Sequence, residues 1–151
     1  MVEIAATITW YGLAQQHLAN AAIDWDTDTI KVSLHTSTYT PAQDTDDFHN
    51  DATNELAASG NYTAGGNTIA NRTSGYTAGT NVQKLDGDDV TFTALTPSAA
   101  FRYGVIYKDR GGASTADELI AYIDFGANQD PGGSDFVITW NASGILTLTA
   151  A

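Results

Sequence analysis

The sequence predicts a mainly β fold, an antiparallel β-sandwich of jelly-roll-like type or a barrel, with one short N-terminal helix. Apolar and polar residues alternate with a period of two over much of the chain, as is typical of strands with one buried face. Turns rich in Gly, Asn and Asp interrupt these runs at short intervals, and no long helical pattern separates them as a βαβ fold would require. We therefore expect a single β domain over residues 1–151.

The helix is predicted near the start of the chain. Over residues 10–20, apolar side chains recur with helical spacing on one face, and Asn20 suits the end of such a helix. Residues 45–56 allow a second, short helix capped by Thr45 or Asp46, or else an acidic loop.

The strands follow from alternation. Two segments, 101–107 and 119–125, are apolar on both sides, which predicts central strands that are covered on both faces. The remaining strands are expected at 30–35, 68–73, 82–85, 90–93, 136–140 and 145–149. Asp86-Gly87 between two of these runs predicts a tight hairpin. Residues 61–66 and 75–80 are similar to each other and are interpreted as two turns, each anchored by a tyrosine.

The charge of the chain excludes several classes of function. Lys and Arg total 6 against 18 Asp and Glu, which gives a formal net charge of -12. Such a chain lacks the basic surface that neutralises phosphates, and it repels anionic lipid head groups, so neither nucleic acid nor a membrane is expected as a partner. It contains no Cys, which excludes disulfides, thiolate nucleophiles and cysteine metal sites. Residues 1–10 are not typical of a signal peptide.

Asp24, Asp26 and Asp28 form the acidic cluster that most resembles a known metal site. Alternate Asp residues resemble the first half of an EF-hand loop, but Thr29 replaces the required Gly and His35 replaces the bidentate Glu. A looser calcium site at these three residues remains an alternative. The favoured interpretation is a polar turn in which the Asp side chains accept hydrogen bonds from backbone amides.

The sequence indicates no catalytic site and no cofactor. The acidic stretch Asp44, Asp46, Asp47, Asp51 and Glu55 lies in one segment, so it does not supply two acids across a cleft, as glycoside hydrolysis needs. A solvated face or a docking surface for a basic partner is favoured. The histidines lack metal-ligand spacing: His17 is expected in packing, and His35 on the polar side of a strand. We therefore predict a protein that is not an enzyme.

The aromatic residues suggest where a partner binds. Tyr62 and Tyr76 lie in polar turns and are predicted to be exposed contacts, since tyrosine at a turn gives rigid contact area. The three tryptophans would form a sugar-stacking platform if exposed, but the alternation around Trp140 favours the core instead.

A resemblance adds a context to these observations. It runs from the first tryptophan to Gly144-Ile145-Leu146, over nearly the whole chain. Six segments resemble small virion structural proteins of tailed bacteriophages: WYG at 10–12, DWDTDTIKV at 24–32, YTP at 39–41, YTAGG at 62–66, VIYKD at 105–109 and YIDFG at 122–126.

The resemblance implies a place in a virus particle, assembled in the host cytoplasm, and transfers no catalytic residue. An acidic, Cys-free β domain suits a capsid decoration or cement protein that binds the major capsid protein, or other virion proteins, on the outside of the head. We expect a homo-oligomer, with a trimer as the guess from this role. Residues 1–9, with Val2 and Ile4, are a candidate contact arm. The alternative is a tail or fibre component with a receptor- or carbohydrate-binding role.

Overall fold

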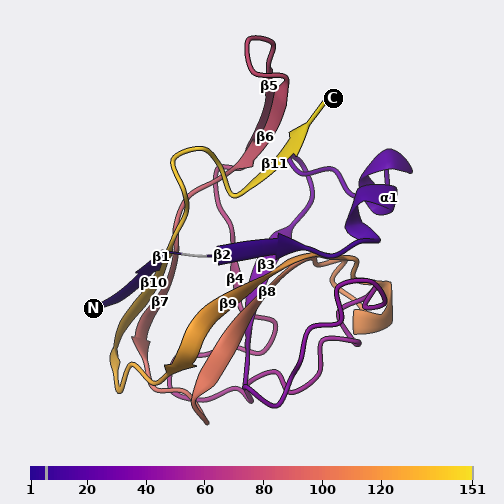
Figure 1. Ribbon diagram of the computed structural model, residues 1–151. Coiled ribbons are helices and arrows are strands. Elements are labelled where there is room, and N and C mark those ends of the chain that lie inside the picture. The colour runs from indigo at the N-terminus through magenta and orange to yellow at the C-terminus, as the bar shows by residue number, and fades with distance from the viewer. Residues whose placement is uncertain (6, 151) are drawn as a thin grey trace.

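The computed structural model describes residues 1–5 and 7–150 (Figure 1). These residues form one α-helix, one short 3₁₀ helix and eleven strands arranged in three sheets. The elements in chain order are β1 (Val2–Ala5), β2 (Thr7–Trp10), α1 (Ala14–Ala19), β3 (Ile30–His35), β4 (Asn67–Thr68), β5 (Thr73–Thr77), β6 (Val82–Asp86), β7 (Val90–Leu95), β8 (Phe101–Lys108), η1 (Ser114–Ala116), β9 (Leu119–Gln129), β10 (Ser134–Thr139) and β11 (Leu146–Thr149).

The largest sheet is antiparallel and has the strand order β2-β9-β8-β3-β4. The two strands predicted to be central, β8 and β9, lie in its middle, which confirms that prediction. Their apolar character on both sides has a direct cause. One face of the sheet packs on the main core, and the opposite face packs on a second cluster that includes Tyr11, Tyr39 and Val105.

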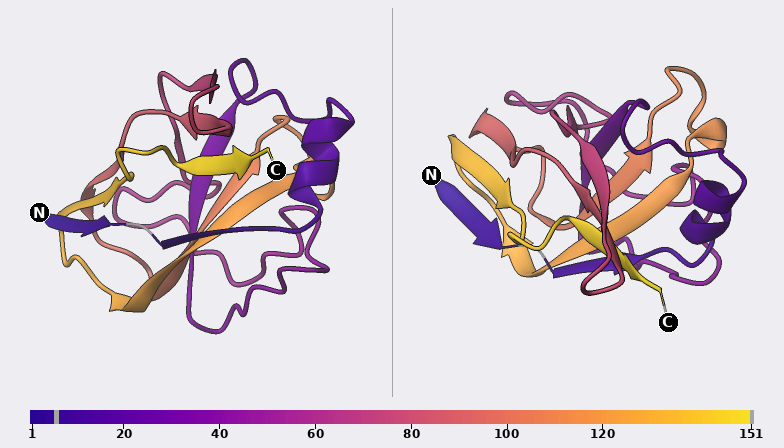
Figure 2. Two further views of the ribbon diagram at one scale, coloured as in Figure 1. Left: turned by 45° about the horizontal axis from the view of Figure 1, so that its top comes forward. Right: turned by 90° about the horizontal axis from the view of Figure 1, so that it is seen from above.

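The second sheet, β1-β10-β7, lies across the main core from the largest sheet (Figure 2). β10 and β7 are antiparallel, whereas β1 and β10 run parallel, with Val2 opposite Phe136. This pair is the exception in a fold that is otherwise antiparallel. The strand orders of all three sheets are open, so the described residues form a sandwich rather than a closed barrel.

An irregularity in the pairing of β8 with β9 lies where the two layers of the sandwich meet. Strict alternation would place Phe101 on the same face as Tyr103 and Val105. The pairing of β8 with β9 shifts between Phe101 and Tyr103, and Phe101 enters the main core while Tyr103 stays on the second cluster. Between these two pairs β8 has one residue and β9 has four, so the strands go out of step by three residues. An odd shift of this kind reverses the alternation of side chains past the irregularity. Phe101 then meets Phe125 and Phe136 edge to face.

The third sheet has the order β11-β6-β5, and its β5–β6 hairpin projects beyond the rest of the chain at the top of Figure 1. The hairpin predicted at Asp86-Gly87 is therefore wrong. β6 turns back on β5, and the chain after Asp86 crosses to β7 in another sheet. Gly87 is needed for packing at this crossing, because a Cβ there would lie 2.7 Å from Cγ2 of Ile69.

The helix is shorter than predicted. Trp10 pairs with Ala121 as the end of β2, so α1 cannot begin before the chain leaves the sheet at Tyr11. Its C-cap is Asn20, as expected. No described helix has the length and apolar character needed to cross a membrane.

Residues 45–56 contain turns rather than a helix, which confirms the loop interpretation. The two similar turns also differ in structure. Tyr62 lies in a tight bridge between Ser59 and Tyr62, whereas Tyr76 belongs to β5. The strand expected at 68–73 is divided between the short β4 and the start of β5.

Candidate functional site

The densest polar cluster is a chain of hydrogen bonds at the end of β3, centred on Ser33. The hydroxyl oxygen of Ser33 lies 2.8 Å from Nε2 of His35 and 2.9 Å from Nε2 of His49. Nδ1 of His35 lies 2.9 Å from the carbonyl oxygen of Thr53. Ser33 and His35 are completely buried, and His49 is 8% exposed and stacks on Tyr107.

The partners determine the tautomers of this cluster. The Thr53 carbonyl can only accept, so Nδ1 of His35 donates and its Nε2 accepts from the Ser33 hydroxyl. The hydroxyl oxygen in turn accepts from Nε2–H of His49. Burial lowers the pKa of His35 to about 4, against the opposing effects of the Thr53 carbonyl and the Glu55 charge. Burial also lowers the pKa of His49. Both rings are therefore neutral at pH 7.

The expected position of His35 on a solvent-facing side of its strand is wrong. Alternation correctly separates Ser33 and His35 from the apolar residues of β3, but residues 36–53 cover this second face of the sheet. Apolar residues in that segment, such as Tyr39 and Ala52, are the feature of the sequence that could have indicated this cover. The assembly of Ser33, His35 and His49 was missed because His49 comes from the covering segment.

The cluster resembles a serine nucleophile beside a base, but its surroundings do not suit that chemistry. A nucleophile must come within about 3–3.5 Å of the atom it attacks. The Ser33 hydroxyl has no exposed surface, and both of its hydrogen-bonding directions are taken by histidine rings. The base is oriented by a backbone carbonyl rather than by a carboxylate. The geometry therefore supports a role in joining the covering segment to the sheet.

Replacing Ser33 with alanine is expected to lower the free energy of unfolding by about 1–3 kcal/mol. The change leaves ring nitrogens of His35 and His49 without their shared partner in a buried place, where an unpaired polar group is costly. Urea unfolding measures the loss. Ser98→Ala at an exposed position is the control and should change stability by no more than about 0.5 kcal/mol. An equally small change for Ser33→Ala would contradict the hydrogen-bond chain.

Tyr62, predicted to be an exposed contact, is buried with 3% exposure, so that prediction is wrong. Its hydroxyl donates to Oε1 of Glu55 at 2.6 Å and accepts from the backbone N–H of Leu34 at 3.0 Å. Burial first, and then the charge of Glu55, raise the pKa of Tyr62. The same carboxylate oxygen accepts from the N–H of Gly65. Tyr62 and Glu55 thus attach to β3 the part of the chain that follows the covering segment.

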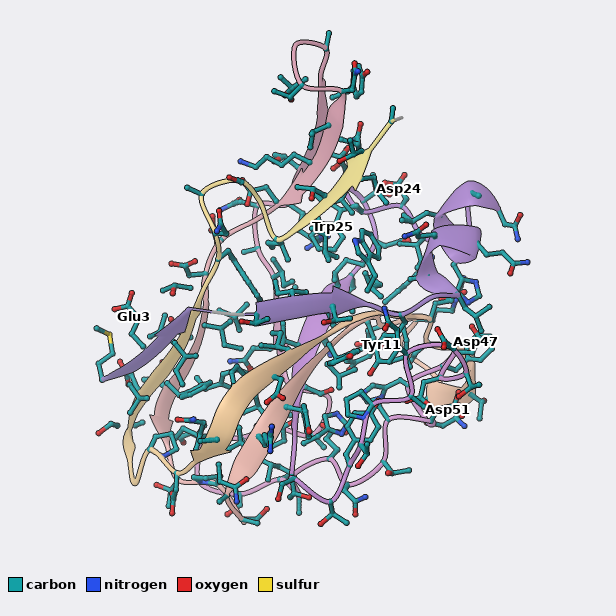
Figure 3. All side chains as sticks on the ribbon, viewed as in Figure 1. Glu3, Tyr11, Asp24, Trp25, Asp47 and Asp51 are labelled. Atoms are coloured by element: carbon teal, nitrogen blue, oxygen red, sulfur yellow. The ribbon has the colours of Figure 1, made fainter. Side chains whose placement is uncertain are left out.

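The acidic segment is not a free solvated face. His17 pairs with Asp47 at 2.6 Å, so it is more than the packing residue expected from the helix. Asp46 accepts from the Tyr39 hydroxyl, and Asp51 accepts from two backbone amides of the same segment. The carboxylates therefore hold the segment in its turns. Figure 3 shows that Asp47 and Asp51 lie well apart from Asp24, so the two acidic groups do not converge on one site.

The Asp24 cluster forms the polar turn that was favoured from the sequence. Oδ1 of Asp24 accepts from the N–H groups of Asp26 and Thr27, and Oδ2 of Asp28 accepts from the N–H of Asp24. Asp28 also pairs with Lys108 at 2.7 Å. The carboxylates are thus directed to amides and a cation. The described residues contain no group of three or more His, Asp or Glu side chains placed to hold a metal ion.

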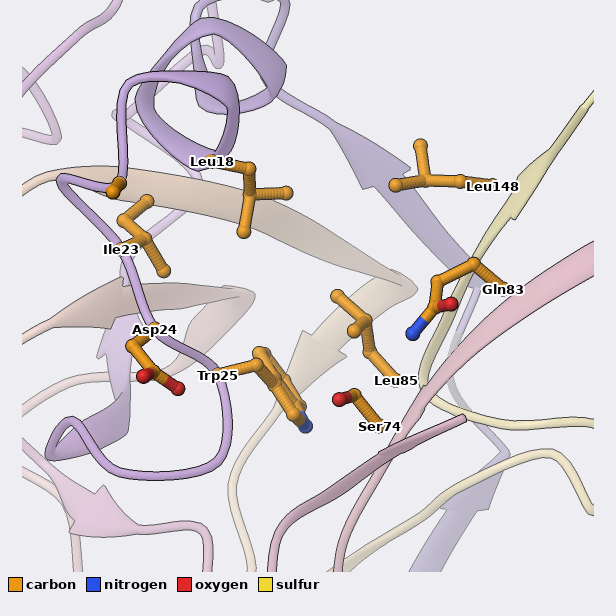
Figure 4. A pocket seen from close by; sticks show the side chains of 9 residues that line it. Leu18, Ile23, Asp24, Trp25, Ser74, Gln83, Leu85 and Leu148 are labelled. Atoms are coloured by element: carbon orange, nitrogen blue, oxygen red, sulfur yellow. The ribbon is translucent and has the colours of Figure 1, made fainter. Parts of the chain in front are cut away.

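A groove of about 370 Å³ lies between this turn, α1 and the third sheet (Figure 4). Trp25 is buried against its side, with its indole N–H donating to the carbonyl of Asp86. Trp10 and Trp140 are only partly buried and pack against the main core at other places. The three tryptophans therefore do not form a platform. The groove is lined by Leu18, Ala21, Ile23, Asp24, Trp25, Ser74, Gln83, Leu85 and Leu148.

The remaining predicted contact residues are Val2 and Ile4 on β1 and Tyr76 on the projecting hairpin. Val2 and Ile4 are half-buried on β1, where they pack against the main core, so residues 2–5 and 7–10 are strands of the fold itself. Only the outer edge of β1 is left for a partner. Tyr76 on the projecting hairpin is 55% exposed, which confirms its predicted exposure. Partner binding at these residues stays a prediction.

Comparison with known proteins adds no assignment to this geometry. Neither family models, nor curated proteins, nor solved structures give a match to the chain. The likeness to phage virion proteins therefore stays a prediction from the sequence.

Proposed function

We propose that this chain is a non-enzymatic structural protein of a tailed-phage particle, and that it decorates the outer surface of the head. The context comes from the resemblance that runs along nearly the whole sequence. The role is supported by one feature of the molecule. Its β5–β6 hairpin, in which β5 carries no charged side chain, projects from the body to where another protein can reach it, whereas its histidine cluster is closed to substrates.

The distribution of charge agrees with this role. A net charge of -12 disfavours contact with packaged DNA, and it limits non-specific association between copies that are crowded on a shell. Binding to the major capsid protein would then rest on backbone and apolar contacts, with charge selecting the orientation. Such contacts need no catalytic residue and no cofactor.

Antibodies against the purified chain test the proposal on intact particles of the phage that encodes it. We expect gold label over the whole head surface in electron micrographs. Antibody that has first been mixed with purified chain is the control, and it should leave the particles unlabelled. Label confined to the tail or to one vertex would contradict decoration and favour the alternative role in a tail or fibre. Unlabelled particles would contradict any place on the particle surface.

A further inference from the structure

β5 is an edge strand, and all five of its residues are exposed. Its hydrogen bonds to β6 can be assigned by alternation. The carbonyl oxygens of Asn81 and Leu85 accept from β11 or the residues next to it, so alternate residues of β6 face that side. Lys84, between them, therefore faces β5 and bonds to its register partner Gly75.

The same alternation applies along β5. Because Gly75 faces β6, Ser74 and Tyr76 direct their backbone N–H and C=O groups to the open edge of the sheet. Two donors and two acceptors are thus presented to a further strand. They lie on a hairpin that projects from the body, where no other described strand pairs with them (Figure 1).

This edge lacks the features that usually prevent strands from pairing. Natural edge strands are often protected by charged side chains, proline or a bulge. No residue between Arg72 and Lys84 is charged or is proline, although the chain carries a net charge of -12. The register between β5 and β6 is continuous, without a bulge. The strand itself therefore brings no charge to such a contact, and the carboxylate of Asp26, which accepts from the Ser74 hydroxyl at 2.9 Å, comes from the Asp24 turn.

Gly75 is a second, independent observation. Its φ lies outside the left-handed region, and a Cβ built on it would have no neighbour within 4 Å. Neither the backbone conformation nor the packing of the single chain requires glycine here. Glycine inside a strand weakens it, and it often marks a place where another backbone approaches closely.

We propose that a second copy of this chain pairs with β5 in antiparallel orientation, around a twofold axis that passes between the two Gly75 residues. Ser74 of each copy then lies opposite Tyr76 of the other and exchanges both backbone hydrogen bonds with it. The two glycines form the closer, non-hydrogen-bonded pair at the axis, where the Cα atoms of such pairs lie about 4.5 Å apart. The strand is self-complementary in this register, as an isologous contact requires.

The side chains fit the same arrangement. Ser74 and Tyr76 lie on the face of the third sheet that also carries Gln83 and Leu85, which line the groove beside Trp25 (Figure 4). Residues that are directly opposite each other in a sheet share a face. Tyr76 of the second copy would therefore lie next to Ser74, at the edge of the groove. Pairing would cover the tyrosine, which is among the most exposed large side chains of the described residues.

The pairing gives a dimer, in place of the trimer expected from the role, and it does not depend on a phage particle. Sedimentation of the purified chain over a range of concentrations therefore tests it separately. We expect a reversible increase of the average mass towards twice that of one chain. Tyr76→Pro should weaken the dimer at least tenfold, because it removes an N–H that points away from β6 together with the tyrosine ring.

Two lysine variants complete the test. Tyr76→Lys should also weaken the dimer at least tenfold, and it serves if Tyr76→Pro does not fold. Thr149→Lys makes the same change of charge at the opposite edge of the same sheet and should leave the dimer intact. Circular dichroism reports whether each variant is folded. A monomer at all concentrations, a trimer, folded Tyr76 variants that still dimerise, or loss of the dimer only in Thr149→Lys would each overturn the proposal.

Discussion

Replacing Phe101 with alanine is expected to lower the free energy of unfolding by about 3–5 kcal/mol. Phe101 has no exposed surface, and its ring meets that of Phe136 at 4.9 Å and that of Phe125 at 5.9 Å between ring centroids. These three rings come from β8, β10 and β9, so they join the largest sheet to the second sheet. The loss combines transfer of the ring from the core with the cavity that it leaves.

Urea unfolding of Phe101→Ala and of Phe101→Leu separates the loss of volume from a general intolerance of substitution. Leucine keeps much of the apolar volume, so we expect it to cost clearly less than alanine. A loss below about 1 kcal/mol for Phe101→Ala would show that the site collapses around the missing ring, contrary to a sandwich that is closed by these aromatic contacts.

Stability is expected to fall as the pH is lowered from 6.5 to 5, by about 2 kcal/mol from His35 alone. The pKa of His35 is about 4 in the folded chain and near 6.5 when the ring is in water. Over this interval the unfolded chain binds a proton that the folded chain does not bind, so acid favours unfolding. The stabilising effect is complete above pH 6.5 and is lost progressively down to the folded pKa.

Several titratable and polar groups surround His35, and most of them do not change the direction of this effect. His49, whose pKa is also lowered by burial, adds a loss of the same sign. The Glu55 charge and the Thr53 carbonyl act against it, and the Ser33 hydroxyl donates only to the neutral ring. The pKa of Asp109 and that of Asp124 are lowered chiefly by hydrogen bonds from Lys31 and Arg102. These two carboxylates therefore lose their stabilising effect only at more acidic pH.

Urea unfolding at pH 7, 6 and 5 measures the effect, and a His35→Asn variant is the control. Asparagine can still donate to the Thr53 carbonyl but does not titrate. Its stability should be lower at pH 7 and should depend less steeply on pH between 6.5 and 5. Equal slopes for the two proteins would contradict the assignment of this pH dependence to His35.

Much of the fold could be predicted because strand alternation and burial are local properties of the sequence. The central strands β8 and β9 were recognised from apolar residues on both sides, and β3 from its strict alternation. The hairpin at Asp86-Gly87 was not predictable in this way. A two-residue turn motif has the same local chemistry whether the chain folds back on its own sheet or crosses to another one.

The candidate sites show the same difference between local contacts and contacts between distant segments. The Asp24 turn was interpreted correctly, because the hydrogen bonds from backbone amides that close it join residues no more than four positions apart. Tyr62 was wrongly expected at the surface, because its partners Leu34 and Glu55 lie 28 and 7 residues away. The cluster of Ser33, His35 and His49 depends on a covering segment whose place on the sheet is not encoded by any periodicity.

The sequence by itself determined a mainly β chain with one short helix, its central strands, and a charge that disfavours DNA and anionic membranes. Only the tertiary structure decided which polar residues are covered and which edge is open. His35 is expected on the polar side of a strand and Tyr76 in a polar turn, yet His35 is completely buried and Tyr76 is 55% exposed. The physical reason is that alternation separates the two faces of a strand, whereas contacts between distant segments determine what lies against each face.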